Sequence, residues 1–89
     1  MIVPQHLRLT LFCAKVHTVA TLEGRAWVCG TKDDIDLDFE NVQELVDLGI
    51  LEISPDGVVR DGGSLDDAFT TTFADGVLPQ HPGLQKASA

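Results

Sequence analysis

The acidic residues of this 89-residue chain are concentrated in its middle, and that distribution opposes compaction and limits even more strongly which surfaces the folded chain can approach. Between residues 33 and 75 there are thirteen aspartates and glutamates and a single basic residue, Arg60. The first 32 residues are instead weakly basic, and the formal net charge of the chain is −8. Like charges at this density repel one another and destabilise a compact state, and they restrict which surfaces the protein can approach.

Length and composition predict a single small domain. A chain of 89 residues can form one core, and its apolar content of 44% is too high for a disordered protein. We expect one α+β domain over residues 1–78, with one or two helices and a short antiparallel β-sheet. From Pro79 the chain is rich in proline, glycine and small polar residues, so residues 79–89 are predicted to be a flexible C-terminal tail.

The beginning of the chain contains neither a membrane span nor a recognisable secretory signal. Residues 1–22 lack acids, but they include basic or titratable side chains at His6, Arg8, Lys15 and His17. A membrane helix would need about 20 predominantly apolar residues. A signal peptide would need a basic start and a longer apolar run than the one found here. We therefore expect a cytoplasmic protein that does not contact membranes.

Two interpretations remain open for residues 5–21. As a helix, Leu7, Leu11 and Ala14 fall on one stripe, and Gly24 follows the end as a cap. As strands, the leucines alternate with polar residues, and the threonine- and valine-rich run at 16–22 pairs with residues 25–29. The absence of a turn signal before Gly24 favours the helix. Residues 25–29 are predicted to be a strand in either case.

The most clearly predicted element is a helix over residues 39–48. Residues 30–38 look like a polar connection that ends in Asp38, a good N-cap. Apolar residues recur at helical spacing after Phe39, and Gly49 can adopt the left-handed conformation at the end.

Residues 50–60 predict a hairpin around the turn sequence Pro55-Asp56-Gly57. We then expect a loop over residues 61–67. A threonine-rich strand is predicted at 68–73, with Phe69 and Phe73 on one face.

Part of this pattern resembles a known family. The run from Val42 to Glu52 resembles the third helix of a winged-helix domain, and residues 50–60 and 68–73 are similar to its wing, so that the likeness covers about two-fifths of the chain. In DNA-binding members of that family, the third helix enters the major groove and basic side chains contact phosphates. Here the same helix carries Glu40, Glu44 and Asp47. This departure from the family's basic helix argues against DNA binding and leaves open a winged-helix scaffold that contacts protein.

No motif indicates catalysis or a cofactor. Acids alternate from Asp34 to Glu40 as in a calcium loop, but neither possible starting position supplies the glycine at the sixth place. Cys13 and His17 could share a helix face, yet a zinc site needs further ligands at recognisable spacing. We expect no metal, no cofactor and no enzymatic activity. Cys13 and Cys29 are interpreted as buried thiols, although a disulfide between adjacent strands stays open.

The remaining hypothesis is a protein-binding module, either an inhibitor or an adaptor. Its acidic residues would dock on a basic protein or nucleoprotein complex, including one that otherwise holds nucleic acid, and no direct nucleic-acid binding is expected. We call the candidate partner-binding residues the acidic face: Asp33, Asp34, Asp36, Asp38, Glu40, Glu44, Asp47 and Glu52.

In size and acidity the chain resembles the small inhibitors that bacteriophages use against host nucleases, CRISPR complexes or transcription machinery. Two alternatives are a structural or assembly subunit, for example of a virion or a secretion machine, and a winged-helix regulator that binds DNA.

Overall fold

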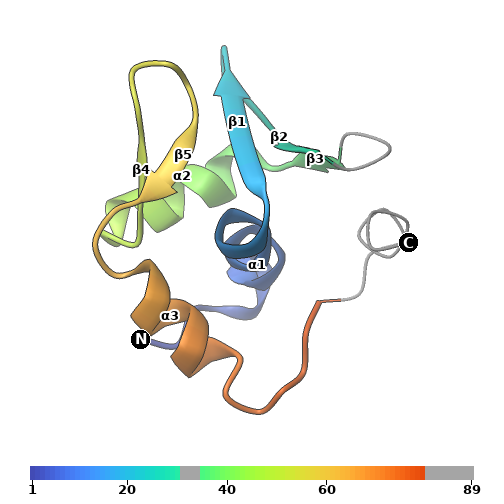
Figure 1. Ribbon diagram of the computed structural model, residues 1–89, viewed down its shortest axis with the longest axis vertical. Coiled ribbons are helices and arrows are strands. Elements are labelled where there is room, and N and C mark those ends of the chain that lie inside the picture. Colours follow the sequence, from blue (N-terminus) through green and yellow to red (C-terminus); the bar gives the residue numbers. More distant parts are fainter. Residues whose placement is uncertain (31–34, 80–89) are drawn as a thin grey trace.

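A computed structural model describes residues 1–30 and 35–79 of the chain, and it confirms a small α+β domain (Figure 1). In chain order, the described elements are η1 (Gln5–Leu7), α1 (Arg8–Val16), β1 (Thr18–Leu22), β2 (Arg25–Cys29), β3 (Ile35–Leu37), α2 (Phe39–Asp47), β4 (Leu51–Ile53), β5 (Val59–Asp61) and α3 (Leu65–Thr72).

The first region combines the two interpretations of the sequence. Helical structure runs from Gln5 to Val16, and the chain then becomes the strand β1, so the predicted helix over residues 5–21 is wrong in its last third. The helix ends where the His17 amide donates to the Cys13 carbonyl at 2.8 Å and His17 takes up an extended conformation. The β-branched residues that follow pair with β2 across their whole length, and this pairing decides the conformation.

Strands β1, β2 and β3 form an antiparallel sheet in that order. One row across it, Val19, Val28 and Ile35, is buried against the helices. The interpretation of residues 30–38 as a polar connection is therefore wrong for Ile35–Leu37. Apolar Ile35 contributes to the core from an edge strand, while the intervening Asp36 points to solvent.

The predicted helix over residues 39–48 and the hairpin after it are confirmed. Asp38 caps α2 by accepting a hydrogen bond from the Glu40 amide at 2.9 Å, and Gly49 has the expected positive φ of 79°. Val42 and Leu45 are fully buried on the inner face of the helix. Strands β4 and β5 then pair in register around the Pro55-Asp56-Gly57 turn.

The β4–β5 hairpin contacts the three-stranded sheet near its tip, where Val58 forms an antiparallel bridge with Ala20 of β1. The hairpin and β1 lie side by side in Figure 1. The Gly57 carbonyl accepts hydrogen bonds from both the amide and the hydroxyl of Thr21, each at 2.8 Å. Gly57 has a φ of 86°, and a Cβ at this position would lie 2.6 Å from the Thr21 carbonyl oxygen. Only glycine fits this junction without displacing β1.

The strand expected at residues 68–73 is wrong, because this segment belongs to helix α3, which also shortens the loop expected at 61–67. Leu65, Ala68 and Thr72 recur at helical spacing and are buried. The spacing of Phe69 and Phe73, four residues apart, suits a helix face as well as a strand face. Packing against α1 outweighs the strand preference of the threonines.

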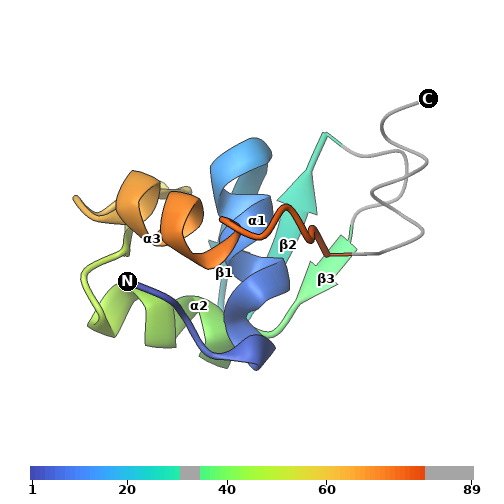
Figure 2. The ribbon, with the colours of Figure 1, turned by 90° about the horizontal axis from the view of Figure 1, so that it is seen from below.

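Helix α1 lies at the centre of the domain. It contacts α2, α3 and β1. In Figure 2 it lies between the helices α2 and α3 on one side and the strands β2 and β3 on the other. Its buried Leu11 and Cys13 join Leu7 from η1 and Leu45 from α2 in one core. Asp33 and Asp34 of the acidic face, and the predicted tail apart from Pro79, lie outside the described residues.

Candidate functional site

The six described residues of the acidic face follow one another through three consecutive elements. Asp36 lies on β3, Asp38 caps α2, and Glu52 lies on β4; Glu40, Glu44 and Asp47 belong to α2 itself. All six side chains are exposed. The carboxylates are therefore presented by regular structure, which fixes their backbone positions.

Within α2 the acids lie on a single helix face. Glu40, Glu44 and Asp47 are separated by four and three residues, the spacing that brings side chains onto neighbouring turns of the same face. The opposite face contributes Val42 and Leu45 to the core. We call these three residues the α2 stripe.

The α2 stripe is unfavourable for the helix that carries it. Glu40 lies in the first turn, where the helix dipole favours a negative charge, but Asp47 lies in the last turn, which contains no basic residue. Glu40 and Glu44 also form a like-charged pair four residues apart. The side-chain amide of Gln43 offsets part of this cost, because it donates a hydrogen bond to Oδ1 of Asp47 at 3.1 Å. The charges of the stripe nevertheless oppose the helix dipole and one another.

Basic groups elsewhere do little to neutralise the acidic face. His6 from η1 contacts Glu44, with 3.0 Å between Nε2 and Oε1. Arg60 is the residue opposite Glu52 in the hairpin, but its guanidinium is directed to Asp56 at 3.4 Å. The other ion pairs between described side chains join basic residues to acids outside the face: Arg8 to Asp75 and Lys15 to Asp66.

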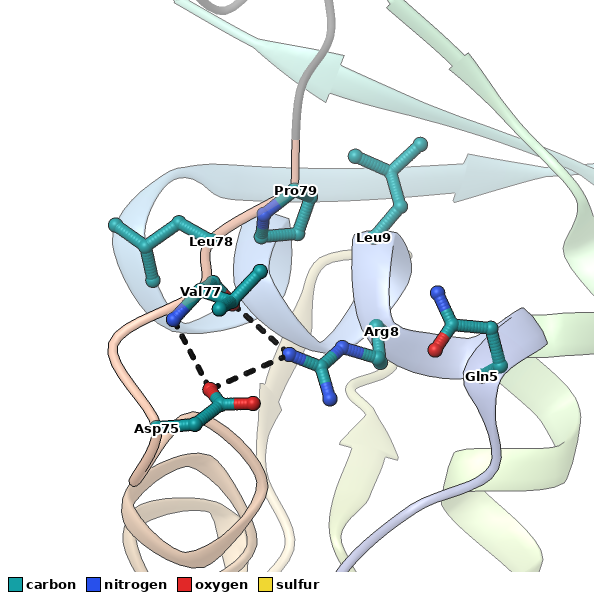
Figure 3. A pocket seen from close by; sticks show the side chains of 7 residues that line it. All are labelled: Gln5, Arg8, Leu9, Asp75, Val77, Leu78 and Pro79. Atoms are coloured by element: carbon teal, nitrogen blue, oxygen red, sulfur yellow. Dashed lines mark hydrogen bonds and ion pairs between the residues drawn. The ribbon is translucent and has the colours of Figure 1, made fainter.

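A pocket of about 430 Å³ opens between the start of α1 and the residues after α3 (Figure 3). It is lined by Gln5, Arg8, Leu9, Asp75, Val77, Leu78 and Pro79. This pocket could not be predicted from the sequence, because its two sides are about seventy residues apart and neither carries a motif. The acidic face contributes no residue to it.

Arg8 organises the pocket. Its Nη2 donates to the Val77 carbonyl oxygen at 2.9 Å and lies 3.8 Å from Oδ1 of Asp75, as the dashed lines in Figure 3 show. The guanidinium carbon also lies 4.8 Å from the centroid of the Phe73 ring, within the range of a cation–π interaction. A single side chain of α1 thus contacts three residues of the segment that follows α3.

The two cysteines differ in their exposure. Cys13 and Cys29 are both free, and Cys13 is completely buried. Burial raises the pKa of the Cys13 thiol to about 11, which keeps it protonated and poorly nucleophilic. Across residues 1–30 and 35–79, no three His, Cys, Asp or Glu side chains are grouped so that they could hold a metal ion.

None of the helices within the described ranges combines the length and apolar character needed to cross a membrane. Comparisons with protein-family models, with curated proteins and with solved structures gave no match. The winged-helix resemblance accordingly stays a prediction.

Proposed function

We propose that this protein is a non-enzymatic binding module whose acidic face docks on a basic surface of a protein or nucleoprotein complex. The observation that carries the proposal is the α2 stripe. Three exposed carboxylates lie on one helix face, where Glu44 repels Glu40 and the charge of Asp47 opposes the helix dipole. A role in contacting another molecule explains why such residues are found together.

The geometry suits a rigid partner. The stripe is carried by α2, which is anchored by two fully buried side chains and capped by Asp38. Asp36 and Glu52 are exposed on the strands that precede and follow the helix in the chain. Charges held in fixed positions lose little conformational entropy on binding, so they match a complementary basic surface better than charges on a mobile segment.

The charge of the surface also indicates the kind of partner. Phosphate backbones would be repelled by a chain whose formal net charge is −8. A basic groove, such as one that normally holds nucleic acid, would be attracted by the same charge. Inhibition by occupying such a groove is therefore the mode of action that we propose.

The test compares two variants with equal net charge. One neutralises the α2 stripe as Glu40→Gln, Glu44→Gln and Asp47→Asn; the control neutralises three exposed acids elsewhere, Glu23→Gln, Asp66→Asn and Asp67→Asn. Each immobilised protein is incubated with host-cell extract, and the retained proteins are eluted with increasing salt and identified. Because exposed charge interactions are screened over about 10 Å at 0.1 M salt, a specific partner should elute as the salt concentration rises.

We expect the control to retain the same basic partner as the natural protein and the stripe variant to lose it. If both variants lose the partner equally, net charge alone explains the binding, and the proposal of a defined binding face is contradicted. Retention that resists salt and survives both variants would favour an assembly subunit with an apolar interface. A shift of duplex DNA in a gel at moderate salt would instead support the DNA-binding alternative.

A further inference from the structure

We propose that the pocket between α1 and residues 75–79 binds a small amphipathic carboxylate, with Arg8 as the group that holds the carboxylate. The site is separate from the acidic face and does not depend on the function proposed above. Its chemistry follows from one guanidinium, an apolar lining and a nearby acid.

The guanidinium of Arg8 keeps unused hydrogen-bonding capacity. An arginine has five N–H donors, yet with respect to the described residues this one makes a single hydrogen bond, to the Val77 carbonyl. The Arg8 side chain is only 17% exposed, so water can reach only a small part of it. Phe73 lies against the face of the guanidinium, so an acceptor would meet the N–H groups at its edge. A carboxylate matches those donors in charge and in planar geometry.

The rest of the pocket suits a short apolar body. Leu9, Val77, Leu78 and Pro79 line it, and Val77 and Leu78 are 62% and 46% exposed. A volume of about 430 Å³ lies within the range of small-molecule sites.

Asp75 acts as an internal competitor for Arg8. Its Oδ1 accepts a hydrogen bond from the Val77 amide at 3.0 Å and stays 3.8 Å from the guanidinium, beyond ordinary hydrogen-bond distance. The pair is therefore loose, and a ligand carboxylate can engage the remaining donors. The same negative charge disfavours a doubly charged ligand, which is why we infer a monocarboxylate and not a phosphate.

The first experiment titrates the full chain with isocaproate, with the neutral isocaproamide and with inorganic phosphate, followed by backbone amide NMR. We expect isocaproate to shift the amides of Leu9, Val77 and Leu78, and the other two probes to leave them unchanged. Equal shifts with the amide would show that Arg8 does not select for charge. Equal shifts with phosphate would show that no apolar body is required. Shifts outside the pocket, or none with isocaproate, would also overturn the proposal.

Two variants test the roles of the charged residues. Arg8→Gln should weaken isocaproate binding by at least about tenfold, because a charge-assisted hydrogen bond is lost. Arg60→Gln, a surface arginine outside the pocket, should leave it unchanged. Asp75→Asn should tighten binding by about two- to fivefold, since an amide can still accept from Val77 but no longer competes as a charge.

Arg8→Gln also removes the hydrogen bond to Val77 and so could displace residues 75–79. Asp75→Asn keeps Arg8 in place and therefore tests the site independently. Weaker binding in Asp75→Asn would contradict the competitor role and the site. A final arm replaces isocaproate with N-acetyl-leucine, which presents the carboxylate as a peptide C-terminus does. Tighter binding of N-acetyl-leucine would identify a peptide end as the source, and tighter binding of isocaproate would identify a free acid.

Discussion

The hydroxyl oxygen of Thr72 accepts a hydrogen bond from the backbone amide of Val3 at 3.1 Å, across 69 positions of sequence. Both residues are 4% exposed, and the same hydroxyl donates to the Met1 carbonyl at 3.3 Å. The first residues of the described chain are thus attached to helix α3, beside which they lie in Figure 1.

Replacing Thr72 by valine should lower the free energy of unfolding by about 1–3 kcal/mol, because the Val3 amide is left buried without an acceptor. Urea denaturation measures this change. The control is Thr70→Val, an exposed position on the same helix, which should change stability by less than about 0.5 kcal/mol. Equal effects of the two substitutions would show that the buried hydrogen bond is not responsible.

Replacing Gly57 by alanine should destabilise the domain more than replacing Gly24. Both glycines have a positive φ, so alanine is strained at either site by about 1–2 kcal/mol. At Gly57 the added Cβ also meets the Thr21 carbonyl oxygen at 2.6 Å, whereas at Gly24 nothing lies within 4 Å. Thermal unfolding of the two variants compares them, and similar melting temperatures would argue against a close junction between the hairpins.

Neutralising Asp47 should stabilise the domain. Asp47→Asn removes a negative charge from the last turn of α2, which is worth about 0.3–1 kcal/mol at low salt. Glu40→Gln is the matched control, because Glu40 lies in the first turn where its charge is favourable. The gain should diminish as salt is added. A stability loss in Asp47→Asn would contradict the view that the stripe is kept at the expense of the helix.

Asp56 should contribute to stability at neutral pH and lose that contribution in acid. Hydrogen bonds from the Ser54 hydroxyl and the Val58 amide lower its pKa below the ordinary value of 3.8. A depressed pKa in the folded state adds stability that is complete above 3.8 and disappears as the pH falls through the folded value. The stability difference between the natural protein and Asp56→Asn should therefore shrink in that window, measured by denaturant unfolding at a series of acidic pH values.

The two thiols should differ in reactivity. Cys13 is completely buried and its pKa is about 11, whereas Cys29 is partly exposed. A thiol reagent at neutral pH should label Cys29 in the native protein and reach Cys13 only after unfolding. Cys29→Ser should abolish the native reaction. Rapid labelling of Cys13 in that variant would show that α1 opens readily.

The sequence predicted the elements whose signals are local. Helix α2 has a capping aspartate, periodic apolar residues and a terminal glycine, and the following hairpin has a strong turn. Predictions from the sequence were wrong where tertiary contacts determine the secondary structure. Threonines at 18–21 and 70–72 have the same intrinsic preference, yet the first group pairs with β2 and the second packs as a helix on α1. A single sequence does not contain those partners.

Of the two candidate sites, one could be predicted from local sequence and the other could not. The acids of the α2 stripe could be named from their positions, since helical spacing alone places Glu40 and Glu44 on one face. The Arg8 pocket could not be named, because nothing near Arg8 in the sequence indicates that Val77 and Asp75 will lie beside it. Pairing between distant segments is the information that only the folded chain provides.

The junction between Thr21 and Gly57 bears on how the protein is made. Strand β1 is synthesised early, but its neighbour in the β4–β5 hairpin emerges from the ribosome some 36 residues later, and Thr72 later still. Contacts between such distant segments form slowly, since the loops that join them must close first. We expect the nascent chain to remain incompletely folded, with the core face of α1 uncovered, until α3 has been translated.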